Sequence, residues 1–189
     1  MTNSRLLDST SSAPPLKALL LVGFVSFGSV GCASGGKYEL STVPTVATTS
    51  FRSVEVSAVE TEITTSELEP GLVSVILRSE IVTAILEEET YQQVVAEVQD
   101  PEGAITVSCR IAEYDKGSQV GRYFLSLFGT GRAHLDVACS FTDKENHRAV
   151  AAGVFTGWIK GGWLGGAANQ WNMAKNVGKA IARFLKESR

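Results

Sequence analysis

Apolar and polar positions alternate along three stretches of the chain, and this two-residue period is typical of β-strands with one buried face. In the first stretch, residues 53–63, Val54 and Val56 fall on one face. The other two alternating stretches lie in the second half of the chain, at residues 104–114 and 132–141. A further strand, made of small and apolar residues, is expected over 149–159 after the turn-like residues 143–146. We therefore expect four strands, the last three of which follow one another without an intervening helix.

Apolar residues recur every three or four positions in two further stretches, which predicts helices over about 71–88 and 169–187. The inward stripe of the first helix is expected to comprise Leu72, Val75, Ile76, Val82 and Leu86. The inward stripe of the second is expected to comprise Trp171, Ala174, Val177, Ile181 and Leu185. The order β-α-β-β-β-α predicts a single small α+β domain, with a largely antiparallel sheet and two helices packed on it.

Residues 1–31 have the organisation of a secretory signal peptide. Arg5 and Lys17 precede an uncharged, mostly apolar run over residues 18–31. This run is shorter than the roughly 20 residues that a membrane-spanning helix needs. The sequence therefore favours a removed signal peptide over a retained membrane span.

Ser29, Val30 and Gly31 directly precede Cys32, and this arrangement resembles the lipobox of bacterial lipoproteins. The resemblance implies that the chain is cut before Cys32 and that fatty acyl chains on this cysteine hold the protein on a membrane. Ser29 departs from the pattern, because the family prefers leucine there. The alternative is an ordinary signal peptide with Cys32 left as a free thiol. Ala33 stands where an inner-membrane retention signal has aspartate, so we expect the outer membrane of a bacterial cell envelope, with the domain facing the periplasm.

Composition indicates where the globular domain begins, and net charge limits the classes of partner that we expect. Residues 33–50 are rich in Ser, Thr and Gly and lack apolar periodicity, which predicts a flexible, lipid-anchored tether over residues 32–50 and a globular domain over 51–189. The chain has a net charge of −3. It lacks the basic character with which nucleic-acid-binding proteins neutralise phosphates, so nucleic acid is not an expected partner.

Cys109 and Cys139 both fall on the apolar faces of consecutive predicted strands. If these strands form a hairpin centred near residue 124, the two cysteines face each other across it. An exported compartment permits oxidation, so we expect a structural disulfide. The alternative, two buried and reduced thiols, remains open.

The same register places Tyr114 opposite His134, with Asp136 next along the outward face. A tyrosine, a histidine and an aspartate on one face could act in acid-base catalysis. We favour the alternative, in which they form a solvated polar face of the sheet. Neither His134 nor His147 has neighbours at metal-ligand spacing, and no motif of an activated nucleophile accompanies them. The sequence thus predicts no enzyme, no metal and no cofactor.

The connection over residues 115–130 is unusually apolar for a loop. Its apolar residues include Tyr123, Phe124, Leu125 and Phe128. The order of features around it resembles a family of bacterial lipoproteins known as the domain of unknown function numbered four-four-one-zero. These features are a strand, the pair Gly117-Ser118, then Arg122, the apolar patch, the Gly129-x-Gly131 pattern, and an alternating strand that leads to an acidic turn at Asp143.

This resemblance covers about residues 51–188 and implies an envelope lipoprotein domain of α+β type. It implies no established activity and no residues of known role. The chain departs from the family pattern after Asp143, where a glycine is expected and the sequence has Lys144, Glu145, Asn146 and His147.

A Gly-rich segment over residues 157–166 lacks the spacing of a phosphate-binding loop.

We expect a non-catalytic module that binds another envelope component, with the oligomeric state left open. The expected contact residues are Tyr123, Phe124, Leu125, Phe128, Trp158 and Trp163. Two alternatives remain, namely an envelope enzyme that uses the face of His134, Asp136 and Tyr114, and a carrier of lipid or small molecules.

Overall fold

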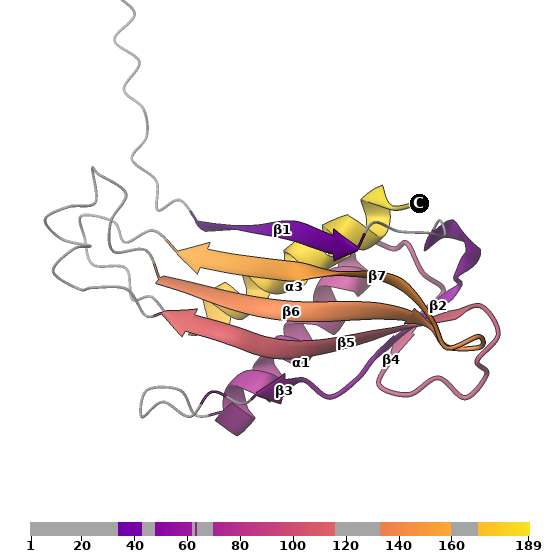
Figure 1. Cartoon of the computed structure of the whole chain (residues 1–189), viewed down its shortest axis with the longest axis horizontal. Helices are drawn as coiled ribbons and strands as arrows, with labels where there is room; N and C mark the ends of the chain where they lie inside the picture. Colours follow the sequence, from indigo (N-terminus) through magenta and orange to yellow (C-terminus); the bar gives the residue numbers. More distant parts are fainter. Residues whose placement is uncertain (1–33, 43–47, 62, 64–69, 116–132, 160–169) are drawn as a thin grey trace, which may run out of the picture.

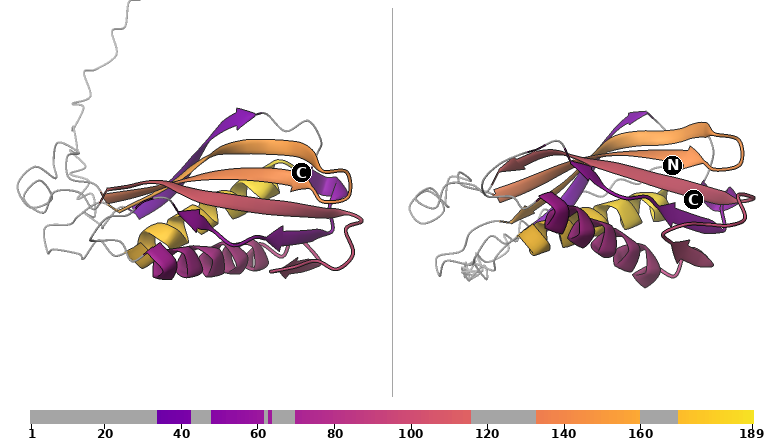
Figure 2. Two further views of the ribbon diagram at one scale, coloured as in Figure 1. Left: turned by 60° about the horizontal axis from the view of Figure 1, so that its bottom comes forward. Right: turned by 90° about the horizontal axis from the view of Figure 1, so that it is seen from below.

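A layer of two helices covers one face of a twisted sheet (Figure 1). The computed structural model describes residues 34–42, 48–61, 63, 70–115, 133–159 and 170–189. The helices are α1 (Pro70–Glu87) and α3 (Gln170–Glu187), which pack along each other. Figure 2 shows both helices on the same side of the sheet, so the described part of the chain leaves the other face open.

The sheet is mixed, with strand order β1-β7-β6-β5-β2-β4 and with β3 paired to β5 farther along that strand than β2. The pairs β1–β7, β7–β6 and β6–β5 are antiparallel, whereas β2 is parallel to both β5 and β4, and β3 is parallel to β5. The strand bounds are β1 Ser34–Thr42, β2 Ser53–Val56, β3 Glu60–Thr61, β4 Gln93–Val95, β5 Ala104–Asp115, β6 Ala133–Asp143 and β7 Arg148–Ile159. A short 3-10 helix spans Thr48–Ser50. The α+β architecture is the one that the sequence predicted.

Strand β1 corrects the prediction of a flexible tether. Its residues pair with β7 from Ser34 opposite Ile159 onward, and they form an edge of the sheet. Tyr38 anchors the strand, because its ring contacts Phe155 and its hydroxyl donates a hydrogen bond to the carboxylate of Glu187. The Ser-, Thr- and Gly-rich composition concealed this strand, since its stability comes from a partner strand and from distant side chains rather than from its own apolar pattern.

The inward face of α1 also differs from the prediction. Its buried residues are Val73, Leu77, Ile81, Ala84 and Ile85. Leu72, Leu86 and Val75 are instead exposed, Val75 to 68%. Apolar residues occur all around α1, so their spacing alone did not select one face. Neither helix of the described part is long and apolar enough to cross a membrane.

Helix α3 follows its predicted stripe with one exception. Ala174, Val177, Ile181 and Leu185 are buried as expected. Trp171, at the start of the stripe, is 56% exposed. The prediction for Trp171 is therefore wrong.

Aromatic rings from the sheet and from α3 fill the centre of the core. Phe184 of α3 lies 4.8 Å, between ring centroids, from Phe141 of β6 and 5.9 Å from Phe155 of β7. Tyr38 of the edge strand β1 completes the group, with its ring centroid 5.5 Å from that of Phe184. Three strands and one helix therefore meet in a single cluster of rings, which joins the helix layer to the sheet.

Two glycines let α3 approach the sheet closely. Gly36 of β1 and Gly157 of β7 are partners in the register. A Cβ atom on Gly36 would come within 2.2 Å of the Asn176 carbonyl oxygen, and one on Gly157 within 2.1 Å of the Met173 carbonyl oxygen. The backbone of α3 therefore rests directly on the sheet at this point, where no side chain fits between them.

The turn between β6 and β7 is held by Asp143. Its carboxylate accepts hydrogen bonds from the backbone N–H groups of Glu145 and Asn146, at 3.1 Å and 3.2 Å, and from the Asn146 side chain at 3.0 Å. These contacts, the Asn146 side chain foremost, lower the pKa of Asp143. His147 adopts a left-handed φ of 53°, a conformation that favours glycine.

Candidate functional site

Polar and aromatic side chains gather on the open face of the sheet, near the ends of β5 and β7 and the start of β6. The strand register arranges them in two adjacent rows across four strands. The first row is Lys37 on β1, Thr156 on β7, Asp136 on β6 and Glu113 on β5. The second row is Gly35, Trp158, His134 and Asp115 on the same strands. Most of these residues line one open depression.

A β-bulge in β5 determines which residues reach this face. Up to Ile111 the register is the predicted one, but it shifts between Ile111 and Glu113. Tyr114 then lies opposite Leu135 and packs against the core, and Glu113 lies opposite Asp136. The predicted pairing of Tyr114 with His134 is therefore wrong, because one extra residue moves the following side chains to the other face.

Glu113 is a site residue that the sequence reasoning missed. A signal for it was present in the sequence, because the large apolar residues and the cysteine of this strand fall on odd numbers from Ile105 to Ile111, and the next large apolar residue is Tyr114. Such a break in alternation marks a bulge. The same shift places Tyr114 on the other face of the sheet from His134 and Asp136. An enzyme that used all three side chains on one face is therefore not supported.

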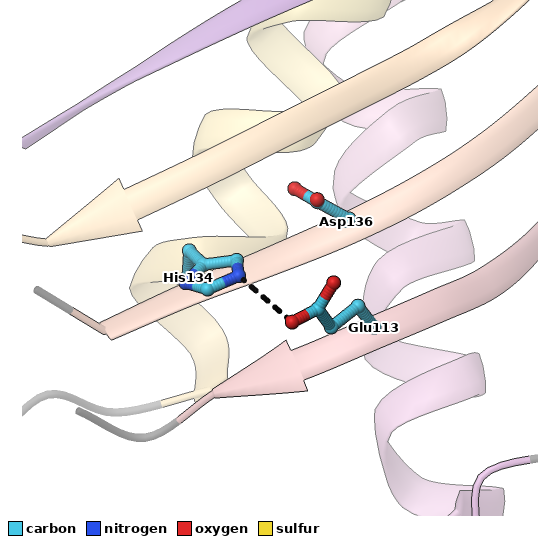
Figure 3. A group of neighbouring side chains, drawn as sticks. All are labelled: Glu113, His134 and Asp136. Atoms are coloured by element: carbon cyan, nitrogen blue, oxygen red, sulfur yellow. Dashed lines mark ion pairs between the residues drawn. The ribbon is translucent and has the colours of Figure 1, made fainter.

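Glu113, His134 and Asp136 point toward one another (Figure 3). The Nε2 atom of His134 lies 3.5 Å from Oε1 of Glu113, and its Nδ1 atom lies 4.0 Å from Oδ2 of Asp115. The Oδ1 atom of Asp136 is buried, and no hydrogen-bond donor among the described residues reaches it. One potential ligand atom from each of Glu113, His134 and Asp136 lies within 4.8 Å of the other two.

Trp158 forms one wall of this depression. A Cβ atom on Gly35 would stand 2.8 Å from the indole ring, so the ring lies over the glycine of the neighbouring strand. The backbone carbonyl of Trp158 accepts a hydrogen bond of 3.0 Å from the Asn176 side chain of α3. Trp158 is the predicted contact residue that the structure describes, and it is on the same face as His134.

Lys37 is the lysine of the first row, and it already forms an ion pair with Glu39. Its ammonium group lies 2.7 Å from the Glu39 carboxylate. That hydrogen bond raises the pKa of Lys37, and the charges of Glu39 and Asp136 add to the effect. The carboxylates of Glu113, Asp115 and Asp136 therefore give the site an acidic character.

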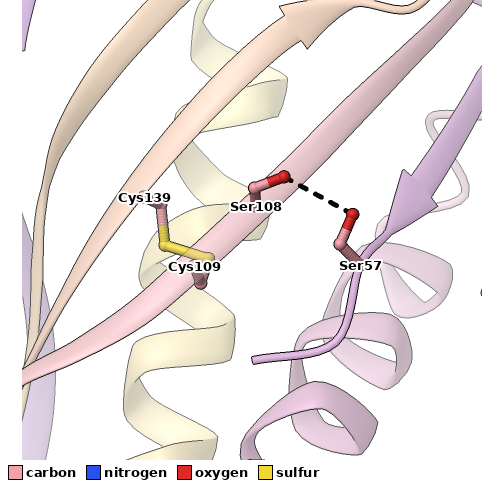
Figure 4. Close-up of a disulfide and its surroundings, with 4 residues drawn as sticks. All are labelled: Ser57, Ser108, Cys109 and Cys139. Atoms are coloured by element: carbon pink, nitrogen blue, oxygen red, sulfur yellow. Dashed lines mark hydrogen bonds between the residues drawn. A yellow bond between two sulfur atoms is a disulfide. The ribbon is translucent and has the colours of Figure 1, made fainter. Parts of the chain in front are cut away.

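Cys109 and Cys139 form the predicted disulfide, between β5 and β6 (Figure 4). The two residues are register partners with Cα atoms 4.2 Å apart, and both are buried on the helix side of the sheet. On the open face beside them, the Ser108 hydroxyl lies 3.4 Å from the Ser57 hydroxyl. The disulfide is thus a cross-link within the core rather than a part of the polar site.

The other predicted contact residues lie outside the described residues. They are Tyr123, Phe124, Leu125, Phe128 and Trp163, and the predicted lipidation site Cys32 is outside as well. The described strand ends nevertheless show where their segments attach. Asp115 is paired with His134, and Ile159 is paired with both Ala133 and Ser34. Segments 1–33, 116–132 and 160–169 therefore all join the sheet at its His134 end.

Two helices on one face of a mostly antiparallel sheet define an α+β domain, and its open face carries an acidic site beside a tryptophan. The chain belongs to the family described as a domain of unknown function (DUF4410), whose model matches residues 46–187. This confirms the family resemblance found in the sequence. No curated protein matches the chain.

Solved structures of low identity are similar to this chain. One is the PelC dodecamer from Paraburkholderia phytofirmans, with 14% identity, a TM-score of 0.47, and coverage of 78% of this chain and 97% of that chain. Another is a protein of the DUF330 family from Xanthomonas campestris, with 12% identity, a TM-score of 0.41, and coverage of 71% of this chain and 81% of that chain.

Proposed function

We propose that this protein is a lipid-anchored lipoprotein of the bacterial cell envelope, whose domain binds another envelope component without catalysing a reaction. The observation that carries the proposal is the position of β1. Only Ala33 separates Cys32 from Ser34, the first residue of β1. Two residues span at most roughly 7 Å, so a lipid on Cys32 would hold the edge of the sheet close to the membrane surface.

The same geometry supports a contact surface at the His134 end. The apolar residues of segment 116–132 and Trp163 of segment 160–169 belong to segments that join the sheet at this end. Trp158 is already there, on the open face. A lipid on Cys32 would direct this end toward the outer membrane, so the expected partner is a component at the periplasmic side of that membrane.

The lipid anchor is tested by replacing Cys32 with serine. We expect Cys32→Ser to abolish metabolic labelling with a fatty acid analogue, because serine has no thiol to accept the lipid. The protein should also move from the membrane fraction to the soluble fraction. Ser29→Leu brings the lipobox closer to its preferred form and should keep full labelling. Unchanged labelling of Cys32→Ser would overturn the proposed anchor.

The contact surface is tested by photo-crosslinking in intact cells. A photoreactive residue at Phe124, Phe128 or Trp158 is expected to give a discrete crosslinked band. Val75 and Trp171 are matched controls, because both are exposed large side chains on the helix layer. We expect little crosslinking from these two positions. Crosslinks of equal strength from both sets of positions, or from the helix positions only, would contradict the proposed surface.

A further inference from the structure

The group of Glu113, His134 and Asp136 has the chemistry of a metal site. An imidazole nitrogen and two carboxylates form a ligand set that suits zinc and similar divalent transition metals. Each residue offers one ligand atom within 4.8 Å of the other two. Zinc binds such atoms at about 2.0–2.2 Å, so the group closes around an ion when the side chains move inward by roughly an ångström. Glu113 is free to make that movement, since its side chain is 64% exposed.

Asp136 supplies an independent indication. Its Oδ1 atom is buried, and within the described residues it has no hydrogen-bond partner. A buried carboxylate oxygen without a hydrogen-bond partner loses its hydration and gains no hydrogen bond in its place. A cation coordinated by this oxygen would offset that cost.

The environment of His134 agrees with the same role. The imidazole that ligates a metal through one nitrogen usually donates its other N–H to a carboxylate, which fixes the orientation of the ring. Here Nε2 lies 3.5 Å from Glu113, and Nδ1 lies 4.0 Å from Asp115. A small movement of Asp115 toward Nδ1 would let it accept the N–H of this nitrogen, while Nε2 is the nitrogen nearer to Glu113.

The charge and the scaffold also favour a cation. Three carboxylates surround the imidazole, and the nearby ammonium group of Lys37 already contacts Glu39. The ligands come from β5 and β6, which are paired through most of their length. A sheet holds ligand positions more firmly than a loop does.

We propose that Glu113, His134 and Asp136 bind a divalent transition metal ion of the zinc class on the open face of the sheet, with Asp115 positioning the imidazole. Water completes the coordination on the exposed side. This site does not depend on the lipid anchor or on a partner. Trp158, on the strand next to His134, is a neighbouring reporter whose fluorescence is expected to change when the ion binds.

The test is a titration of the full chain, without an affinity tag, with Zn²⁺ by calorimetry and with Co²⁺ by visible absorption. The Cys32→Ser background keeps the protein free of the proposed lipid and excludes Cys32 as a competing thiol ligand. We expect one ion per chain, and we expect His134→Gln and Asp136→Asn each to weaken binding by more than about tenfold. Glu113→Gln alters an exposed side chain and should keep the fold, so it provides a variant in which weaker binding cannot result from unfolding.

His147→Asn is the matched control, because it removes the second histidine at a left-handed position that asparagine tolerates. This variant should bind like the parent. Failure of the parent to bind Zn²⁺ and Co²⁺ would overturn the proposal. Equal affinity in the parent and in Glu113→Gln, His134→Gln and Asp136→Asn would overturn it as well, as would a loss in His147→Asn that equals the loss in His134→Gln.

Discussion

Replacing Phe184 with alanine is expected to lower the free energy of unfolding by about 4 kcal/mol. Phe184 is 1% exposed, and its ring contacts Tyr38, Phe141 and Phe155. The substitution removes the ring that joins α3 to three strands and leaves a cavity that the packed sheet cannot collapse to fill. Urea unfolding of the purified full chain, followed by circular dichroism, measures the effect.

Trp171→Ala provides the control in the same helix. Trp171 is a larger side chain, but it is 56% exposed, so its loss should change the free energy of unfolding by less than about 0.5 kcal/mol. A larger cost for Trp171→Ala than for Phe184→Ala would show that α3 presents a different face to the sheet.

Removing the disulfide should cost nearly as much. The double variant Cys109→Ala, Cys139→Ala is expected to lose about 3 to 4 kcal/mol, because the unfolded chain regains the freedom of a loop between cysteines 30 positions apart. The same unfolding measurement under non-reducing conditions detects the change. Reductant should destabilise the parent and leave the double variant unaffected.

Ser108→Ala is a matched control for this experiment, since Ser108 is adjacent to Cys109 but is exposed, and its hydroxyl lies a long 3.4 Å from the Ser57 hydroxyl. We expect a change below about 0.5 kcal/mol. Alkylation of the oxidised, denatured parent followed by mass measurement gives a direct check. Modification of both Cys109 and Cys139 there would contradict the disulfide.

The strongest periodic patterns predicted the fold correctly. Alternation located β5 and β6, and the apolar residues after the turn at 143–146 located β7. A hairpin centred near residue 124 gave a β5–β6 register that holds as far as Ile111. Three- and four-residue spacing located both helices to within a residue or two. Where the apolar residues of an element are confined to one face, as in β6 and most of α3, the local pattern and the tertiary structure agree. Helix α1 is the exception, because its apolar residues occur on all sides and did not indicate the buried face.

The features that the sequence did not reveal depend on contacts with distant residues. The composition of β1 is typical of a linker, partly because the strand contains Gly35 and Gly36. These glycines are needed because Trp158 and α3 pack closely against them, and neither favours a strand by itself. The position of Glu113 depends on a bulge, which a regular alternation cannot contain. The group of Glu113, His134 and Asp136 was missed for two reasons. Glu113 joins it because of the bulge, and the three residues are neighbours across two strands, with no motif spacing along the chain.

The pairing of β1 with β7 has a consequence for how the domain folds. The first described strand finds its partner only near residue 159, well over half the chain later. Such remote pairings raise the contact order, and proteins rich in them fold slowly because a long loop must close before the contacts repay its entropy. During synthesis from the N-terminus, β1 is therefore made early and must wait for its partner. A chain that stops before β7 would leave β1 unpaired and the edge of β6 exposed.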